Sequence, residues 1–407
     1  MTQLPAADWL HSPGLARVVT ALKTAQGPPR LVGGAVRDSL LGLSVTDIDL
    51  ATPILPDQVI SRLEAAQIKA VPTGIDHGTV TAVASGETFE ITTLRRDVST
   101  DGRRATVAFS EDWREDAARR DFTLNALYAD PVTGEVFDYF GGLNDLKTRH
   151  LRFIGNAADR IDEDHLRILR YFRFLARFGG GKVNSEALVA CADGAPKMMA
   201  LSRERIASEL MKIMDLTDPG QAVRLMAENG IFQAFLPEFI GQGPQILKRL
   251  IEREQRHSLR ASSTSRLLCL LPADVQIADK IAMRLKLSNR MRKDMAALIG
   301  GRSICADNIR AFAFHNGLES ARDAALLFTG DSDLPAALSQ LADWKIPEFP
   351  VKGGDIIAKG LTAGPVVAQT IKEIRDSWIA HGFPAGATLG AIVDQYVAAA
   401  LLASKKE

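Results

Sequence analysis

The sequence predicts an α+β protein, in which an N-terminal α/β unit is followed by helices up to the C-terminus. Strand-like and helix-like patterns alternate up to about residue 145. After about residue 147 the apolar residues recur with helical spacing, and strand signals fade. Mixed strands and helices that precede a purely helical stretch indicate a sheet-containing unit followed by helical units.

Composition fits a globular protein with several structural units. The chain has 407 residues, of which 46% are hydrophobic, enough for two to four units. Uninterrupted apolar runs fall short of the ~20 residues that span a membrane, and the N-terminus lacks the pattern of a secretory signal. Cys191, Cys269 and Cys305 are far apart, which favours a reducing compartment over disulfides or a zinc site. We therefore expect a cytoplasmic protein with no membrane partner.

Charge is balanced overall but uneven along the chain. The formal net charge is zero, which argues mildly against a nucleic-acid partner. However, residues 167–182 carry five positive charges and no acidic residue, and 248–260 and 284–293 are mainly basic. Local basic stripes of this kind matter more for nucleic-acid binding than the net charge of the whole chain.

A glycine turn near the N-terminus is the first candidate site. Leu31–Val32 has the pattern of a buried strand end, and Gly33 and Gly34 follow it. A glycine pair permits a tight turn in which backbone N–H groups approach a phosphate. A short helix over residues 35–41 with Arg37 comes next, and Gly42 fits its C-terminal stop.

A pair of carboxylates follows this turn. Asp47 and Asp49 alternate with apolar residues, as on a strand with one apolar face. Period two places both carboxylates on one side, where they can hold a hard cation such as Mg²⁺. A solvated strand face has the same pattern. Glu90, on the predicted strand 88–94, is either a third carboxylate near this pair or a solvated strand residue.

The remaining elements of the first unit follow in order. We predict a helix over 56–67, a turn feeding a strand over 71–84, and a polar, mobile loop over 95–113 with Asp101-Gly102 at its centre. Residues 119–127 form a second motif, Arg-Arg-Asp-Phe-Thr-Leu-Asn-Ala-Leu. Arginines can form paired hydrogen bonds with phosphate oxygens, and Asp121 could accept from ribose hydroxyls. An ordinary salt-bridged helix start is the alternative.

Residues 160–174 are predicted to form one helix with a polar row. Asp164, Arg167 and Arg170 are spaced one turn apart, which is also the pattern of a plain salt-bridge ladder. The other interpretation is a base-reading row, in which a carboxylate accepts from an exocyclic amino group and an arginine donates to a ring acceptor. Cytosine and adenine offer that combination, whereas uracil and guanine do not. Residues 201–214 are predicted to form a further helix, with Ser202 as its N-cap.

The two motifs, in this order, resemble the nucleotidyltransferase superfamily that includes DNA polymerase beta. In the form Gly-Gly-x-x-Arg-Asp, residues 33–38 resemble bacterial tRNA nucleotidyltransferases (CCA-adding enzymes) and their poly(A) polymerase relatives. Residues 119–126 resemble the family's Arg-Arg-Asp-Phe-x-x-Asn-Ala element. Residues 163–167 match its nucleotide-selecting template, Glu-Asp-x-x-Arg. The resemblance is strong over about residues 28–215 and weak beyond.

The resemblance implies a division of roles. Asp47 and Asp49 would bind Mg²⁺, with Glu90 as a candidate third catalytic carboxylate. Asp164 and Arg167 would select the base. The remaining nucleotide-binding residues would be Gly33, Gly34, Arg37, Arg120, Asp121, Arg170 and Arg173. In the family, a flexible loop at the place of 95–113 is implicated in the switch from C to A addition.

The resemblance also implies an organisation and a function. We expect a catalytic head (1–146), a neck with the template (147–215), an RNA-binding body (216–345) and a tRNA-binding tail (346–407). The tail contains a glycine-bounded turn over 359–366 that is either helix-hairpin-helix-like or a plain turn. The expected reaction adds C, C and A to the 3′ end of tRNA from CTP and ATP. The alternatives are a poly(A) polymerase, an enzyme adding only A or only CC, and a non-catalytic RNA-binding protein on the same fold.

Overall fold

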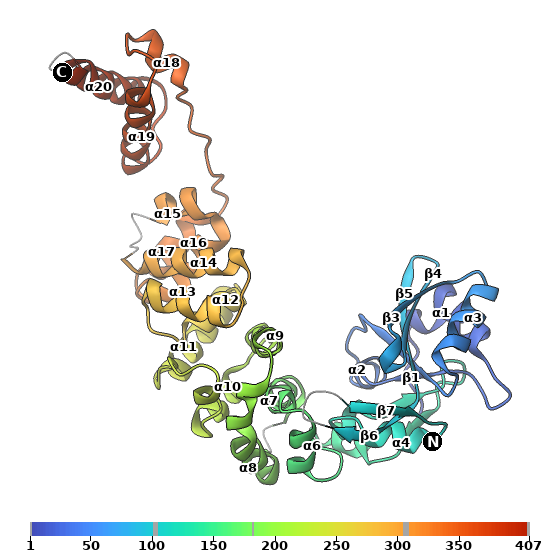
Figure 1. Cartoon of the computed structure of the whole chain (residues 1–407). Helices are drawn as coiled ribbons and strands as arrows, with labels where there is room; N and C mark the ends of the chain where they lie inside the picture. Colours follow the sequence, from blue (N-terminus) through green and yellow to red (C-terminus); the bar gives the residue numbers. More distant parts are fainter. Residues whose placement is uncertain (1, 101–104, 181–182, 304–308, 405–407) are drawn as a thin grey trace. The chain divides into compact units, whose positions relative to one another are not determined.

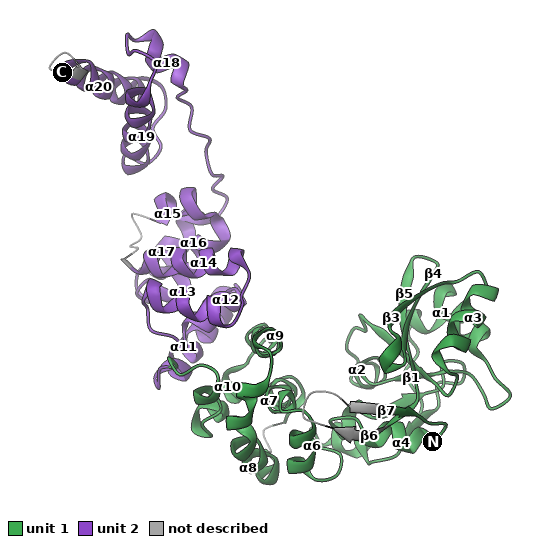
Figure 2. Ribbon diagram, in the orientation of Figure 1, with its two compact units in different colours: residues 1–239 green, residues 240–407 purple. Residues whose placement is uncertain are grey.

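The computed structural model describes residues 2–100, 105–180, 183–303 and 309–404. The chain divides into two compact units, Met1–Phe239 and Ile240–Glu407 (Figure 2). The first unit contains the sheets and several helices, and the described residues of the second contain helices and loops without strands (Figure 1). The predicted α+β class is confirmed.

A mixed sheet forms the centre of the first unit. In the described residues it has seven strands in the order β3-β4-β5-β2-β1-β8-β9. Among the described strand pairs, β2–β5 alone is parallel, and it places Asp49 opposite Glu90. The strands are β1 (Arg30–Val32), β2 (Ile48–Thr52), β3 (Lys69–Gly74), β4 (Thr79–Ala84), β5 (Glu87–Thr93), β8 (Leu127–Ala129) and β9 (Val136–Asp138).

Alternation of apolar residues positions these strands. On β4, Val80, Ala82 and Ala84 are buried while the residues between them are partly exposed, as expected for a strand with one face toward a core. The helices of this part are α1 (Pro13–Leu22), α2 (Gly34–Leu40), α3 (Pro56–Ala65), α4 (Trp113–Ala118) and α5 (Gly142–Lys147). The predicted helix after the glycine turn is α2, and the predicted helix 56–67 is α3.

The expectation of a loop over 95–113 is wrong for most of that stretch. β6 (Arg95–Thr100) and β7 (Ala105–Phe109) pair antiparallel as a separate two-stranded ribbon, and α4 begins at Trp113. Polar composition favours a loop, yet cross-strand bonds satisfy the backbone groups of a polar ribbon equally well. Asp101 and Gly102 lie outside the described residues.

Helices complete the first unit after residue 147. They are α6 (Ala157–Glu163), α7 (Leu166–Phe178), α8 (Ser185–Gly194), α9 (Arg203–Met214) and α10 (Gly220–Glu228). Ser202 accepts from the N–H of Arg205, so the predicted N-cap of α9 is confirmed.

The prediction of one continuous helix over 160–174 is wrong. The backbone of Asp164 is extended, with φ −154° and ψ 104°, so α6 ends before it. Asp164 Oδ1 then accepts from the N–H of Leu166 at 3.1 Å, which satisfies a backbone donor at the start of α7 in the manner of a cap. The break turns the carboxylate of Asp164 out of the expected helical row.

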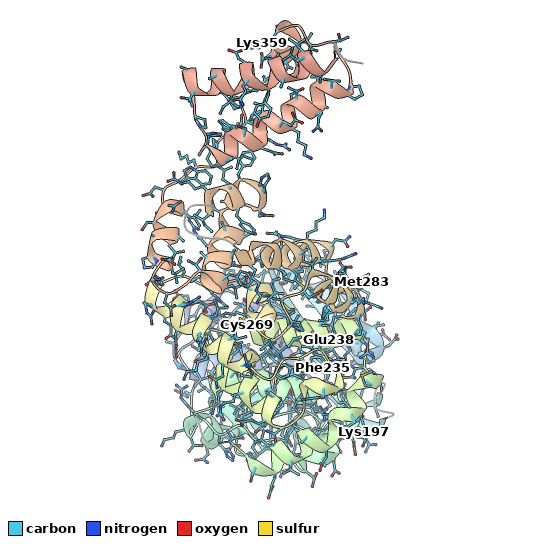
Figure 3. The ribbon with its side chains drawn as sticks, turned by 90° about the vertical axis from the view of Figure 1, so that its left-hand side faces the viewer. Lys197, Phe235, Glu238, Cys269, Met283 and Lys359 are labelled. Atoms are coloured by element: carbon cyan, nitrogen blue, oxygen red, sulfur yellow. The ribbon has the colours of Figure 1, made fainter. Side chains whose placement is uncertain are left out.

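The second unit is built from helix pairs. Its helices are α11 (Gly243–His257), α12 (Ser263–Leu268), α13 (Val275–Arg284), α14 (Asn289–Gly300), α15 (Ile309–Asn316), α16 (Leu318–Phe328), α17 (Leu334–Leu341), α18 (Gly353–Ala358), α19 (Pro365–Ala380) and α20 (Gly386–Ser404). Cys269, labelled in Figure 3, is a buried free thiol, as is Cys191 of the first unit. Cys305 lies outside the described residues.

The last helix bears on the expectation that the chain has no segment apolar enough to span a membrane. Over Gly386–Ala403, α20 is long and apolar enough to cross a membrane by length and composition. Counting uninterrupted apolar runs misses this stretch because Asp394 interrupts it. Asp394 pairs with Lys359, the residue labelled in Figure 3, at 2.6 Å. Ile392 and Val397 of α20 lie in a buried cluster with residues of α18 and α19.

Candidate active site

A cavity of about 500 Å³ in the first unit brings the two sequence motifs and the template stretch together. It is open to solvent and strongly polar, unlike the apolar pockets typical of drug-like ligands. A larger cavity, of about 600 Å³, opens between the starts of α6 and α8 and contains none of the predicted site residues. The lining of the first cavity is Gly33, Gly34, Arg37, Asp49, Arg95, Arg119, Arg120, Asp121, Asn125, Asp164, Arg167, Arg170 and Phe174.

The glycine turn faces two guanidinium groups. Gly33 has φ +67°, a conformation that L side chains rarely adopt, and a Cβ there would lie 3.6 Å from Arg120 Nη1. A Cβ on Gly34 would lie 3.8 Å from Arg37 Nη2. The absence of side chains therefore keeps the turn open beside two cations, an arrangement that suits a phosphate.

Arg37 is held firmly while one end stays available. Its side chain is buried, Nε donates to Asp38 at 2.8 Å and Nη1 donates to Asn125 at 2.5 Å. The guanidinium carbon lies 4.3 Å from the centre of the Phe178 ring. Burial lowers the pKa of Arg37, and Asp38 opposes that shift. Among the described residues Nη2 has no hydrogen-bond acceptor, so it can donate to an anion at the turn.

Arg120 and Asp121 of the second motif are also held by neighbours. Arg120 donates from Nε to Tyr128 and from Nη2 to Asp116, which leaves Nη1 at the glycine turn. Asp121 accepts from Asn125 and, through Oδ2, from Arg170 at 2.5 Å. Burial would raise the pKa of Asp121, but Arg170 and these hydrogen bonds lower it. Asp121 is thus already engaged within the protein.

Asp49 has the properties of a cation ligand. Its half-buried carboxylate forms no hydrogen bond or ion pair among the described residues, and Glu90 is its neighbour across the β2–β5 pair. Burial, then Glu90 and Asp47, raise the pKa of Asp49 to about 6, against an opposing effect of Arg120. A divalent cation would relieve this uncompensated negative charge.

Asp47 and Glu90 are exposed and lie outside the cavity lining. The described residues contain no group of three acidic, histidine or cysteine side chains that could hold a metal by themselves. Mg²⁺ is commonly bound by one or two carboxylates together with substrate phosphates and water. The donor set of Asp47 and Asp49 fits that pattern, and would be completed by a bound substrate.

The template residues occupy one wall of the cavity. Asp164 Oδ2 accepts from Arg205 of α9 at 2.6 Å. Arg167 donates to Glu163 at 2.5 Å and to the carbonyl of Arg119 at 3.3 Å, and its Nε has no acceptor among the described residues. Asp164 and Arg167 therefore both line the cavity, although a helix break separates them.

The arginines of α7 lie opposite its buried apolar face and fasten it to its surroundings. Arg170 pairs with Asp121, and Arg177 pairs with Asp38 of α2. Arg173 lies 2.7 Å from Glu209 of α9 and is absent from the cavity lining. Of the predicted nucleotide-binding residues, Arg173 is the one that the structure does not bring to the cavity.

Four lining residues have no role predicted from the sequence. Arg119 and Asn125 lie inside the second motif, and that motif is the sequence signal that could have identified them as site residues. Arg95 starts the β6–β7 ribbon, where the sequence predicts a loop, and Phe174 follows the helical period of apolar core residues. Nothing in their local pattern distinguishes these last two from ordinary ribbon and core positions.

Comparison with known proteins identifies similar family models and relatives. The model of the poly A polymerase head domain matches residues 29–152. The model described as the probable RNA and SrmB- binding site of polymerase A matches residues 182–241. The human mitochondrial CCA tRNA nucleotidyltransferase 1 is 34% identical over 94% of this chain and 89% of its own length. The CCA-adding enzyme of Streptococcus sanguinis is 32% identical over 88% of this chain and 90% of its own length.

Solved structures are similar in fold. The Bacillus stearothermophilus CCA-adding enzyme, solved in complex with CTP, matches with a TM-score of 0.72 and 26% identity over 94% of this chain and 98% of that one. The Thermotoga maritima CCA-adding enzyme matches with a TM-score of 0.68 and 19% identity over 98% of this chain and the whole of that one, a likeness of fold. By sequence identity over nearly its whole length, this chain belongs to the family of CCA-adding tRNA nucleotidyltransferases and their poly(A) polymerase relatives.

Proposed function

We propose that this nucleotidyltransferase adds C, C and A to the 3′ end of tRNA, using CTP and ATP and releasing pyrophosphate. The observation that carries the proposal is the cavity, which collects a glycine turn, arginines, Asp49 and the template pair on one site. Relatives named CCA tRNA nucleotidyltransferase and CCA-adding enzyme, more than 30% identical over most of their length, support the same reaction. The protein would act in the cytoplasm with no membrane partner.

The triphosphate would lie against the glycine turn. Gly33 and Gly34 leave room for phosphate oxygens, and Arg37 Nη2 and Arg120 Nη1 point toward the turn. Arginine hydrogen bonds to phosphate are charge-assisted and strongly directional. Arg170, the neighbouring arginine, contributes positive charge and holds Asp121.

The tRNA 3′-hydroxyl would attack the α-phosphate, forming a P–O bond while the bond to the β-phosphate breaks. Asp47 and Asp49 would hold Mg²⁺, with Glu90 alongside. When bound, Mg²⁺ supplies activation of the hydroxyl and charge compensation for the leaving pyrophosphate. Asp49, with its pKa of about 6, is largely ionised at neutral pH and available as a ligand.

Asp164 and Arg167 would select the base. An acceptor on Asp164 and a donor on Arg167 match the amino group and ring nitrogen shared by cytosine and adenine. Both side chains are anchored by neighbours, which suits a fixed template. For the whole chain we propose a head (1–146), a neck (147–215), a body (216–345) and a tail (346–407), the last two binding tRNA.

An incorporation assay tests this function. Transcripts of tRNA that end before CCA, after C and after CC each receive one labelled nucleotide with Mg²⁺ and are resolved at single-nucleotide length. Two C additions, then one A addition that stops, are expected. Long A tails on any RNA would indicate a poly(A) polymerase, and A addition only after CC would indicate an A-adding enzyme. C addition with no A addition would indicate a CC-adding enzyme, and no incorporation by folded protein would leave a binding role.

A further inference from the structure

A buried carboxylate lies behind the cavity without lining it. Asp116 is on α4, and its side chain is 1% exposed. The roles proposed above do not include it. A buried carboxylate is costly unless it is fully hydrogen-bonded and paired, so its partners indicate what the position serves.

The partners of Asp116 lead to the cavity. Oδ1 accepts from Arg119 Nε at 2.8 Å and from the backbone N–H of Arg95 at 3.3 Å. Oδ2 accepts from Arg120 Nη2 at 3.1 Å and from the hydroxyl of Tyr128 at 2.5 Å. Arg95, Arg119 and Arg120 all line the cavity.

These contacts leave Arg120 a single orientation. Tyr128 accepts from Nε and Asp116 accepts from Nη2, so Nη1 is the end that faces Gly33. An arginine that lacks such anchors has several rotamers to lose when it binds an anion. The same carboxylate also fixes Arg95, where the β6–β7 ribbon begins.

We propose that Asp116 is a positioning residue for the arginines of the cavity, an inference that rests on the function proposed above. It aims Arg120 and Arg119 at the triphosphate of the incoming nucleotide and ties the base of the β6–β7 ribbon to the same point. Burial by itself would raise the pKa of Asp116, but Arg120 and Arg119 outweigh it and lower the pKa to about 2. The carboxylate is therefore ionised at neutral pH.

Asp116→Asn tests the proposal, because it keeps the size of the side chain and removes its charge. Hydrogen bonds to a charged group are about twice as strong as neutral ones, so we expect the KM for CTP and for ATP to rise ~10- to 150-fold. The KM for tRNA should stay within about twofold. Asp145→Asn is the matched control, because Asp145 is a buried carboxylate of the same unit whose partners Arg152 and Thr123 do not line this cavity.

A double-mutant cycle separates positioning from a general loss of structure. If Asp116 acts through Arg120, the rise in KM caused by Asp116→Asn should largely vanish in an Arg120→Lys background. Fully additive effects would overturn the proposal, as would an equal rise in KM with Asp145→Asn. Tyr128→Phe is a milder variant for the case in which the Asp116→Asn protein does not fold. It removes one hydrogen-bond donor to Asp116 and one acceptor for Arg120, and we expect it to raise the KM for CTP to a smaller extent.

A binding measurement keeps this inference separate from the proposed reaction. Calorimetric titration of the full-length protein with pyrophosphate and Mg²⁺ requires neither tRNA nor turnover. Weaker pyrophosphate binding by the Asp116→Asn protein than by wild type would support the positioning role even if no CCA is added. Equal binding by both proteins, or no binding by wild type, would overturn the positioning role whether or not CCA is added.

Discussion

Asp164→Asn tests whether the wall of the cavity reads the base. The structure places Asp164 Oδ1 on the N–H of Leu166, a contact that an asparagine oxygen can keep. The amide nitrogen would then occupy the place of Oδ2 and present donors where an acceptor was. A donor at that place matches the exocyclic oxygen of uracil or guanine and opposes the amino group of cytosine or adenine.

The expected magnitude follows from the interactions that this substitution removes. The ion pair with Arg205 is partly exposed, with side-chain exposures of 39% for Arg205 and 29% for Asp164, so its removal should cost only ~0.5–1 kcal/mol of stability. A good pair of base contacts contributes ~1–3 kcal/mol of discrimination, or about 5- to 150-fold in relative kcat/KM. Selectivity should therefore change far more than stability.

The assay compares kcat/KM for CTP and UTP on a tRNA transcript ending before CCA, with urea unfolding measured in parallel. Asp162→Asn is the matched control. Asp162 lies two residues away and pairs with the exposed Lys197, labelled in Figure 3, outside the cavity. A CTP-to-UTP ratio within twofold of wild type in an active Asp164→Asn protein would refute the base-reading role and leave Asp164 only as the ion-pair partner of Arg205.

Three further outcomes are expected. Asp47→Ala should abolish nucleotide incorporation while urea unfolding stays near wild type, because Asp47 is exposed and, among the described residues, accepts only from its neighbour Thr46. Undiminished incorporation with Mg²⁺ would exclude the metal role. Without metal, Asp49 keeps its proton up to about pH 6 in the folded state but loses it near 3.8 when unfolded. Since the folded state binds more protons in that window, stability should fall by ~1–3 kcal/mol as pH rises through it; unfolding in chelator should show no such fall in the Asp49→Asn protein. Arg266→Met should destabilise the second unit by ~3–5 kcal/mol, because it removes the ion-pair partner of the buried Glu254 carboxylate, which lies 2.5 Å from Arg266. Adding Glu254→Leu should restore most of that stability, as measured by urea unfolding.

Patterns within a few residues identified much of the site. The glycine pair, Arg37 and the alternation around Asp49 correspond to β1, α2 and β2, because a turn, a helix stop and a two-residue period are properties of adjacent residues. The same local criteria failed at 95–113, where the decisive interaction is pairing between two polar strands. They also failed at Asp164, whose extended backbone breaks a run of residues with good helical spacing.

The partners of each charged residue depended on the folded chain. Arg120 and Asp116 are four residues apart, yet their shared contact with Tyr128 requires β8 to pack against α4. Arg173 follows Arg170 on α7 by three residues, just as Arg170 follows Arg167. Its side chain nevertheless pairs with Glu209 of α9 and does not line the cavity. Local sequence was sufficient for the fold class, the family and most of the residues that line the candidate cavity, since these are encoded in short motifs. Tertiary packing decided which guanidinium faces the glycine turn, which carboxylate has no partner among the described residues, and which carboxylate holds several arginines. The physical reason is that an ion pair forms between groups that the fold brings within about 3 or 4 Å.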